Sequence, residues 1–141
     1  MKKILKFKGI KKIYVLGTTD NLVNFIEEIN GLIDFEIILH PKQAYDQLFT
    51  HKNNLKNTLE EKSYNFKIKK KLLLFNNKIF LNCLVINFGS YFNFKKDFII
   101  KNKDRLFNFM PVPLPEFRGG AHVTWAIMKN QKNWGSCFQE I

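Results

Sequence analysis

The sequence predicts an α/β fold with an open, mostly parallel β-sheet. A strand, a helix and a second strand follow one another over about thirty residues near the N-terminus, which is the pattern of a βαβ unit. Residues 79–86 form a continuous apolar run, as expected of a strand buried at the centre of such a sheet. The chain has 141 residues, 45% of them hydrophobic, which is enough for one domain with a single core.

The first βαβ unit is defined by the spacing of its apolar residues. Residues 10–17 predict a buried strand that ends in glycine, and residues 18–21 offer hydroxyl and carboxylate side chains as helix caps. Apolar side chains then recur at helical spacing over residues 22–29, and Asn-Gly at 30–31 ends the helix. Residues 35–39 predict the second strand, so the two strands should lie in one parallel sheet.

Gly17 follows the first strand and precedes the helix, which is where dinucleotide-binding folds hold a pyrophosphate. The sequence from Gly17 onward lacks the other two glycines of the G-x-G-x-x-G pattern. We therefore favour a tight βα turn over a nucleotide cradle at this position.

The middle of the chain has weaker patterns on either side of one strong strand. Residues 42–62 are polar with a sparse apolar stripe and predict a helix or a loop. Residues 64–68 alternate like a third strand, and residues 69–77 predict a short helix. The strand at 79–86 is the strongest in the chain, and residues 94–103 predict a helix after it.

The last third begins with a short strand at residues 106–109. Three prolines between positions 111 and 115 then forbid continued regular structure. Residues 123–129 predict a helix, and residues 136–141 begin a further strand.

The formal net charge of +11 raises the question of a nucleic-acid partner. Only Arg105 and Arg118 are arginine, whereas bidentate recognition of phosphates and bases favours that residue. No known nucleic-acid motif occurs either, so a basic nucleic-acid-binding domain is the least favoured function.

Cysteine content and hydropathy point to a cytoplasmic, reducing setting. The two cysteines, Cys83 and Cys137, make no disulfide framework, and Cys83 lies in an apolar run. No Cys/His cluster has the spacing of a zinc site. The N-terminus lacks the apolar core of a secretory signal, and no apolar run is long enough to span a membrane.

One polar residue stands where chemistry is expected. Asn108 ends the short strand, and in open α/β sheets ligands bind beyond the carboxyl ends of strands. Its amide NH2 could donate to a developing oxyanion.

The stretch from residue 107 to Gly135 resembles the 10-formyltetrahydrofolate-dependent formyltransferases, which include methionyl-tRNA and glycinamide ribonucleotide formyltransferases and sugar N-formyltransferases. Their hallmark reads Asn-x-His-x-x-x-Leu-Pro, then Arg-Gly, a helix, and Gly before a strand. The matching residues are Asn108, Leu114, Pro115, Arg118, Gly119 and Gly135. The likeness is strong over residues 80–141 and only topological before that. It implies a Rossmann-like open sheet with helices on both faces, and residues 1–141 as a single catalytic domain.

The resemblance also implies a reaction and its sites. A formyl group passes from 10-formyltetrahydrofolate to a primary amine, and the family asparagine, here Asn108, stabilises the oxyanion. Arg118 and Gly119 belong to the loop near the substrate, where Arg118 is expected to brace backbone carbonyls. The residues expected to line the folate pocket are Phe88, Gly89, Ser90, Tyr91, Leu114 and Pro115.

Two of the three catalytic positions depart from the family. The family histidine is Met110 here, and a thioether exchanges no protons. The family aspartate would fall beyond Ile141, so the chain resembles a truncated catalytic domain that is inactive or nearly so. His122 is the one candidate substitute, although a packing role at a helix start is the favoured interpretation.

The sequence of the proline loop favours a small-molecule amine as the acceptor. An amino sugar carried on a nucleotide is the first candidate. The alternative to an impaired enzyme is a folate-binding module without catalysis.

Overall fold

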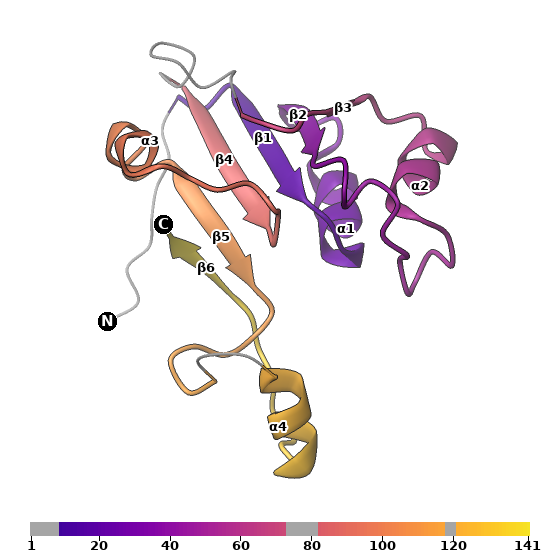
Figure 1. Cartoon of the computed structure of the whole chain (residues 1–141), viewed down its shortest axis with the longest axis vertical. Helices are drawn as coiled ribbons and strands as arrows, with labels where there is room; N and C mark the ends of the chain where they lie inside the picture. The colour runs from indigo at the N-terminus through magenta and orange to yellow at the C-terminus, as the bar shows by residue number, and fades with distance from the viewer. Residues whose placement is uncertain (1–8, 73–81, 118–120) are drawn as a thin grey trace.

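The computed structural model describes residues 9–72, 82–117 and 121–141, and within them the strands form one six-stranded sheet in the order β3-β2-β1-β4-β5-β6 (Figure 1). The strands are β1 (Lys12–Gly17), β2 (Asp34–Leu39), β3 (Phe66–Ile68), β4 (Cys83–Phe88), β5 (Leu106–Met110) and β6 (Cys137–Glu140). The helices are α1 (Asp20–Ile29), α2 (Leu55–Glu61), α3 (Lys96–Lys101) and α4 (His122–Met128). All neighbouring pairs are parallel except β5 and β6, so the predicted open, mostly parallel sheet is confirmed.

The strand order reverses beside β1. From β1 the chain proceeds through β2 to β3 on one side, and then returns to build β4 and β5 on the other side. All six residues of β4 are buried, which confirms a central strand within the predicted range 79–86, although the strand runs on to Phe88 and residues 79–81 lie outside the described part. The reversal places the ends of β1 and β4 at the position where open α/β sheets bind ligands.

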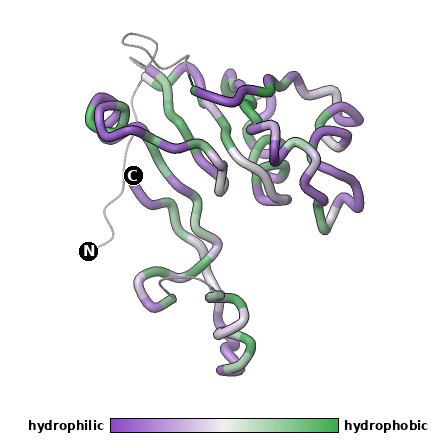
Figure 2. The backbone as a smooth tube through the Cα atoms, in the orientation of Figure 1, coloured by the Kyte–Doolittle hydropathy of each residue, from purple (hydrophilic) through white to green (hydrophobic). Residues whose placement is uncertain are grey.

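Helices cover both faces of the sheet. Helix α1 packs Leu22, Val23 and Ile26 onto one face, together with apolar side chains of α2. The opposite face carries Tyr14, Leu16 and other strand residues, against which Phe98 of α3 packs. Right-handed crossovers require this change of face when the strand order reverses. Figure 2 shows the hydrophobic residues concentrated along the central strands and hydrophilic residues along the outer loops.

The N-cap of α1 falls within the predicted stretch 18–21, but the predicted capping by a side chain is wrong. The N-cap is Thr19, with a backbone φ of 93° and no side-chain cap hydrogen bond. Asp20 instead accepts hydrogen bonds from the amides of Phe49 and Thr50, at 3.0 and 2.8 Å. Burial alone would raise the pKa of Asp20, but these hydrogen bonds outweigh it and the pKa is lowered. The carboxylate therefore fastens a distant loop to the start of the helix.

Residues 42–62 resolve into a loop followed by a short helix. Helix α2 starts after Asn54, whose side chain accepts from the amide of Asn57 at 2.9 Å, as an N-cap should. The predicted helix at 69–77 is wrong over residues 69–72, and residues 73–77 lie outside the described part. The reason is that the amide of Lys69 donates to the carbonyl of Leu39, at 3.0 Å, and continues the pairing between β3 and β2.

Helix α4 covers neither face of the sheet. It lies beyond the end of β5, apart from the other helices (Figure 1). Only Ala126 of its residues is buried, while Trp125 and Ile127 are 53% and 75% exposed. In the part of the chain that the structure describes, no helix is long and apolar enough to cross a membrane.

Glu36 on β2 lies between two lysines, Lys12 at 2.9 Å and Lys67 at 2.8 Å. Burial alone raises the pKa of Glu36, but the hydrogen bonds from Lys67 and Lys12 lower it overall. A lowered folded-state pKa gives stability that is present above the unfolded pKa of about 4.3 and is lost as the pH falls through the folded value.

We therefore expect Glu36→Gln to lower the free energy of unfolding by about 1 kcal/mol at pH 7, since the partners are partly exposed. The difference should shrink as the pH falls below about 4.3. Urea unfolding at a series of pH values measures it. Glu60→Gln, which removes an exposed pair with Lys56 on one helix, is the control and should change little. A constant difference at every pH would contradict the assignment.

Candidate active site

The carboxyl ends of β4 and β5 bring two asparagine side chains together. Asn87 and Asn108 are direct neighbours in the register of the two strands. Asn87 is buried and Asn108 is half-buried, so the amide of Asn108 lies at the rim of the sheet and not in its interior. The pair forms one corner of the site that the sequence predicted around Asn108.

Hydrogen bonds fix which way the amide of Asn108 faces. The NH2 group of Asn87 donates to Oδ1 of Asn108 at 2.9 Å. Nδ2 of Asn108 in turn lies 2.9 Å from Sδ of Met110. A thioether is a weak acceptor, so this NH2 group could exchange its partner for a more strongly charged oxygen. Met110, which stands where the formyltransferase hallmark has histidine, therefore contacts the predicted oxyanion donor directly.

A second buried amide holds the loop that follows β4. Gln43 is 2% exposed, and its Nε2 donates to the carbonyl of Gly89 at 3.0 Å. Its Oε1 accepts from the amide of Tyr91 at 2.8 Å. The amide of Ser90 donates to Oδ1 of Asn87 at 3.0 Å. The three loop residues predicted to bind folate are thus tied to two buried amides that the sequence did not identify.

Phe88 differs from its three neighbours in the predicted folate loop. Its side chain is buried in the core between the rings of Phe25 and Phe109, with centroids at 5.4 and 5.2 Å. Its carbonyl accepts from the amide of Thr18 at 3.2 Å. The side chain of Phe88 is therefore part of the core, and a folate contact there would have to be made by the backbone.

Replacing Gln43 with leucine should loosen this loop. The change leaves the carbonyl of Gly89 and the amide of Tyr91 without their partner, and we expect the free energy of unfolding to fall by about 2 kcal/mol or more. Chemical denaturation measures the loss. Gln47→Leu is the matched control, because the exposed Gln47 makes only a local bond to its neighbour's carbonyl, and it should cost about 0.5 kcal/mol or less. Equal losses in both variants would show that Gln43 does not fasten the loop.

The proline loop after β5 is braced by one tryptophan. Nε1 of Trp134 donates to the carbonyl of Pro111 at 2.9 Å, and its ring lies 5.0 Å from that of Phe117. The Leu114–Pro115 peptide bond is cis, with Leu114 half-buried and Pro115 exposed. Their part in a folate pocket stays a prediction.

The remaining predicted site residues lie past this loop. Arg118 and Gly119 fall outside the described residues. His122 is the first residue of α4 and follows Ala121, which has a left-handed backbone with φ 53°. Whether His122 reaches the pocket stays a prediction. Met110 is half-buried at the end of β5.

Gly17 is required by packing at the turn after β1. A Cβ atom on this residue would lie 2.4 Å from the carbonyl oxygen of Phe88, and the backbone φ is +113°. The favoured tight-turn interpretation of this glycine therefore has a direct steric cause.

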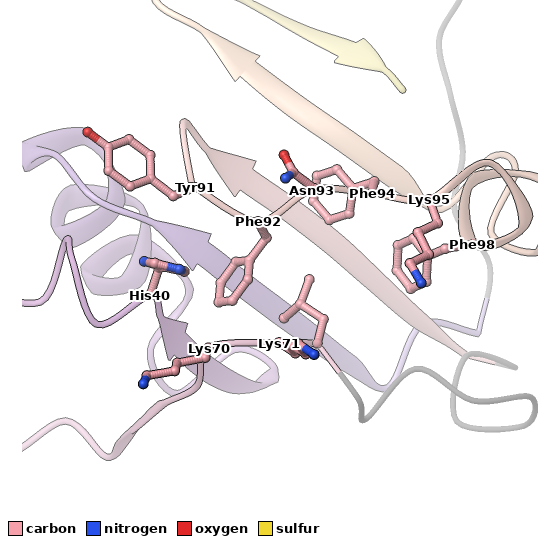
Figure 3. A pocket seen from close by; sticks show the side chains of 10 residues that line it. His40, Lys70, Lys71, Tyr91, Phe92, Asn93, Phe94, Lys95 and Phe98 are labelled. Atoms are coloured by element: carbon pink, nitrogen blue, oxygen red, sulfur yellow. The ribbon is translucent and has the colours of Figure 1, made fainter.

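Two hollows lined by described residues open at or near this edge of the sheet. One of about 560 Å³ lies between the segment after β3 and the segment after β4 (Figure 3), and one of about 320 Å³ lies beside the start of α1. Tyr91 of the predicted folate loop lines the larger one, and Asn108 lines neither. Among residues 9–72, 82–117 and 121–141, no group of three or more His, Cys, Asp or Glu side chains could hold a metal ion.

The sequence matches no protein-family model and no curated protein. Solved structures do resemble it. Phosphoribosylglycinamide formyltransferase from Anaplasma phagocytophilum superposes with a TM-score of 0.63 at 14% identity, over 94% of this chain and 65% of that one. Glycinamide ribonucleotide transformylase 1 from Symbiobacterium toebii gives a TM-score of 0.63 at 13% identity, over 99% and 70% of the two chains.

Formyltetrahydrofolate deformylase from Pseudomonas putida gives a TM-score of 0.58 at 14% identity, over 94% of this chain and 49% of that one. The chain thus spans less than two thirds of the first of these proteins and about half of the deformylase. The names of all three proteins refer to reactions of a formyl group. Each superposes on nearly the whole length of this chain. The chain therefore has the fold of the formyltransferases.

Proposed function

We propose that this chain belongs to the 10-formyltetrahydrofolate-dependent formyltransferases and that residues 1–141 form one catalytic-type domain. The reaction is transfer of a formyl group from 10-formyltetrahydrofolate to a primary amine. The observation that carries the proposal is the orientation of Asn108, whose Oδ1 is held by Asn87 and whose NH2 group faces residue 110. The fold of the formyltransferases supports it.

In the proposed reaction the amine nitrogen attacks the formyl carbon, and the carbonyl oxygen takes up the negative charge. The NH2 group of Asn108 would leave the sulfur of Met110 and donate to that oxygen, which is the role of an oxyanion-hole donor. The intermediate then collapses, the bond from carbon to the folate nitrogen breaks, and the amine proton must be transferred. Asn87 prepares this step, because its hydrogen bond prevents the carbonyl end of Asn108 from facing the oxyanion.

The proton transfer is the weak step in this chain. Met110 stands beside the donor where the family has histidine, and a positioned acid–base group typically contributes about a hundredfold to ten-thousandfold in rate. We therefore propose that turnover is strongly impaired. His122 is the candidate substitute, with a packing role as the favoured alternative.

Formyl transfer to a panel of amines tests the proposal, with nucleotide-linked amino sugars as the first acceptors to try. We expect turnover at least a hundredfold below an ordinary kcat of about 10 per second. A kcat within a hundredfold of the ordinary value would contradict the impairment. In that case Asn108→Ala should abolish the activity if Asn108 is the oxyanion donor.

Folate binding without catalysis is the second candidate function, favoured by the contact between Asn108 and Met110. Calorimetry with a non-reactive folate analogue separates the two, because binding without measurable transfer supports the second. We place either function in the cytoplasm, consistent with the free thiols of Cys83 and Cys137.

A further inference from the structure

The larger hollow lies at the reversal of strand order but away from Asn108. His40 follows β2, Tyr91 and Phe92 follow β4, and β1 lies between these two strands. The segment at 70–72, which follows β3, forms the opposite wall (Figure 3). In open α/β sheets this crevice beyond the strand ends is the usual ligand position. Its volume of about 560 Å³ falls within the range of small-molecule sites.

Aromatic side chains form the inner surface of this hollow. Phe92 is 7% exposed and points into it, with the ring of His40 against its edge at 5.5 Å. Phe94 and Phe98 stack on each other with centroids 5.6 Å apart and an interplanar angle of 13°. Such faces and edges suit a planar ring, which gains contact area at little cost in conformational entropy.

The rim of the hollow is cationic. Lys70, Lys71 and Lys95 line it, and no aspartate or glutamate does. The ion pairs among the described residues use other lysines, namely Lys12, Lys56, Lys62 and Lys67. Three lysines that form no ion pair with a described carboxylate give the hollow a positive potential, and lysine binds phosphate as a point charge.

We propose that this hollow is a binding site for a nucleotide, with the base against the phenylalanine rings and the phosphates at the three lysines. Neither Asn108 nor Met110 lines this hollow, whereas Tyr91 of the predicted folate loop does. Nucleotide binding here does not require formyl transfer, and competition with a folate analogue tests whether the two ligands share this segment.

Calorimetric titration of the whole chain with ADP and UDP tests the proposal, with inorganic pyrophosphate and adenosine as part-ligands. We expect micromolar to submillimolar dissociation constants for the nucleotides, and at least about tenfold weaker binding of either part alone, because rings and charges both contribute. The double variant Lys71→Gln/Lys95→Gln should weaken nucleotide binding about tenfold or more. Lys96→Gln/Lys103→Gln removes the same charge from exposed positions outside the hollow and should change the dissociation constant less than twofold.

Four results would overturn the proposal: no binding at millimolar nucleotide, equal weakening in both double variants, pyrophosphate binding as tightly as ADP, or competition between ADP and a folate analogue. The last would place the ring and carboxylates of folate in this hollow. All four lysines are exposed, so we expect every variant to keep the fold. Thermal unfolding of each variant checks this. If ADP binds and no formyl transfer or folate binding occurs, the proposed function fails while this site stands.

Discussion

Alanine at position 17 is expected to lower the free energy of unfolding by about 3 kcal/mol or more, a large part of the stability of a small domain. The added Cβ would lie 2.4 Å from the carbonyl oxygen of Phe88 and 2.7 Å from its carbonyl carbon. These are backbone atoms of the central strand, which cannot move without disturbing the sheet. The left-handed φ of +113° adds strain that only glycine avoids.

Gly31→Ala separates the steric cause from the conformational one. Gly31 also has a positive φ, +80°, but a Cβ there would meet nothing within 4 Å. We expect a loss of about 1 kcal/mol for this control. Urea unfolding of both variants beside the parent chain measures the difference. A loss at position 17 no larger than at position 31 would show that the turn can move away from β4, and would reopen a ligand-cradle role for Gly17.

Most of the fold could be predicted from the sequence because its signals are local. The apolar run of β4 requires burial on both sides, and helical spacing alone finds α1. The order of elements then restricts the topology, since parallel strands need crossovers of one hand. Helices on both faces follow from that handedness once the strand order reverses.

The errors share a physical cause, which is competition from distant partners. Asp20 was expected to cap its own helix, but amides some thirty positions later in the chain take its carboxylate. Residues 69–72 suit a helix locally, yet the amide of Lys69 pairs with β2. No local pattern contains these contacts.

In the candidate site too, residues with a local sequence signal were predicted and residues that depend on distant contacts were not. Asn108 was predictable, because its strand and the proline loop after it are local features. Gln43 and Asn87 were missed. Asn87 is a polar side chain next to an apolar run, which is the one signal that marked it, whereas Gln43 lies in a polar segment and carried no such signal. Their bonds span 46 and 21 positions in the chain, and only the assembled sheet brings the partners together.

Under the proposed function, replacing Met110 with histidine is expected to raise formyl transfer by about a hundredfold or more, the lower end of what an acid–base group contributes. The contact between Asn108 and Met110 carries this expectation, because the side chain at 110 already lies within 2.9 Å of the proposed oxyanion donor. An imidazole there could accept the amine proton while Asn108 holds the oxygen. Initial rates with 10-formyltetrahydrofolate and the best amine of the panel measure the gain.

Two matched changes show whether the gain is chemical. Met110→Gln is polar but exchanges no proton, and should not exceed the parent rate. Met110→His should also give a rate that titrates with a midpoint near the ordinary histidine value of about 6.5. A folded Met110→His variant that binds the folate analogue but gains no rate would mean that residue 110 lies off the reaction path. The amide of Asn108 would then be a structural link between strands, and folate binding without transfer would become the better account of this chain.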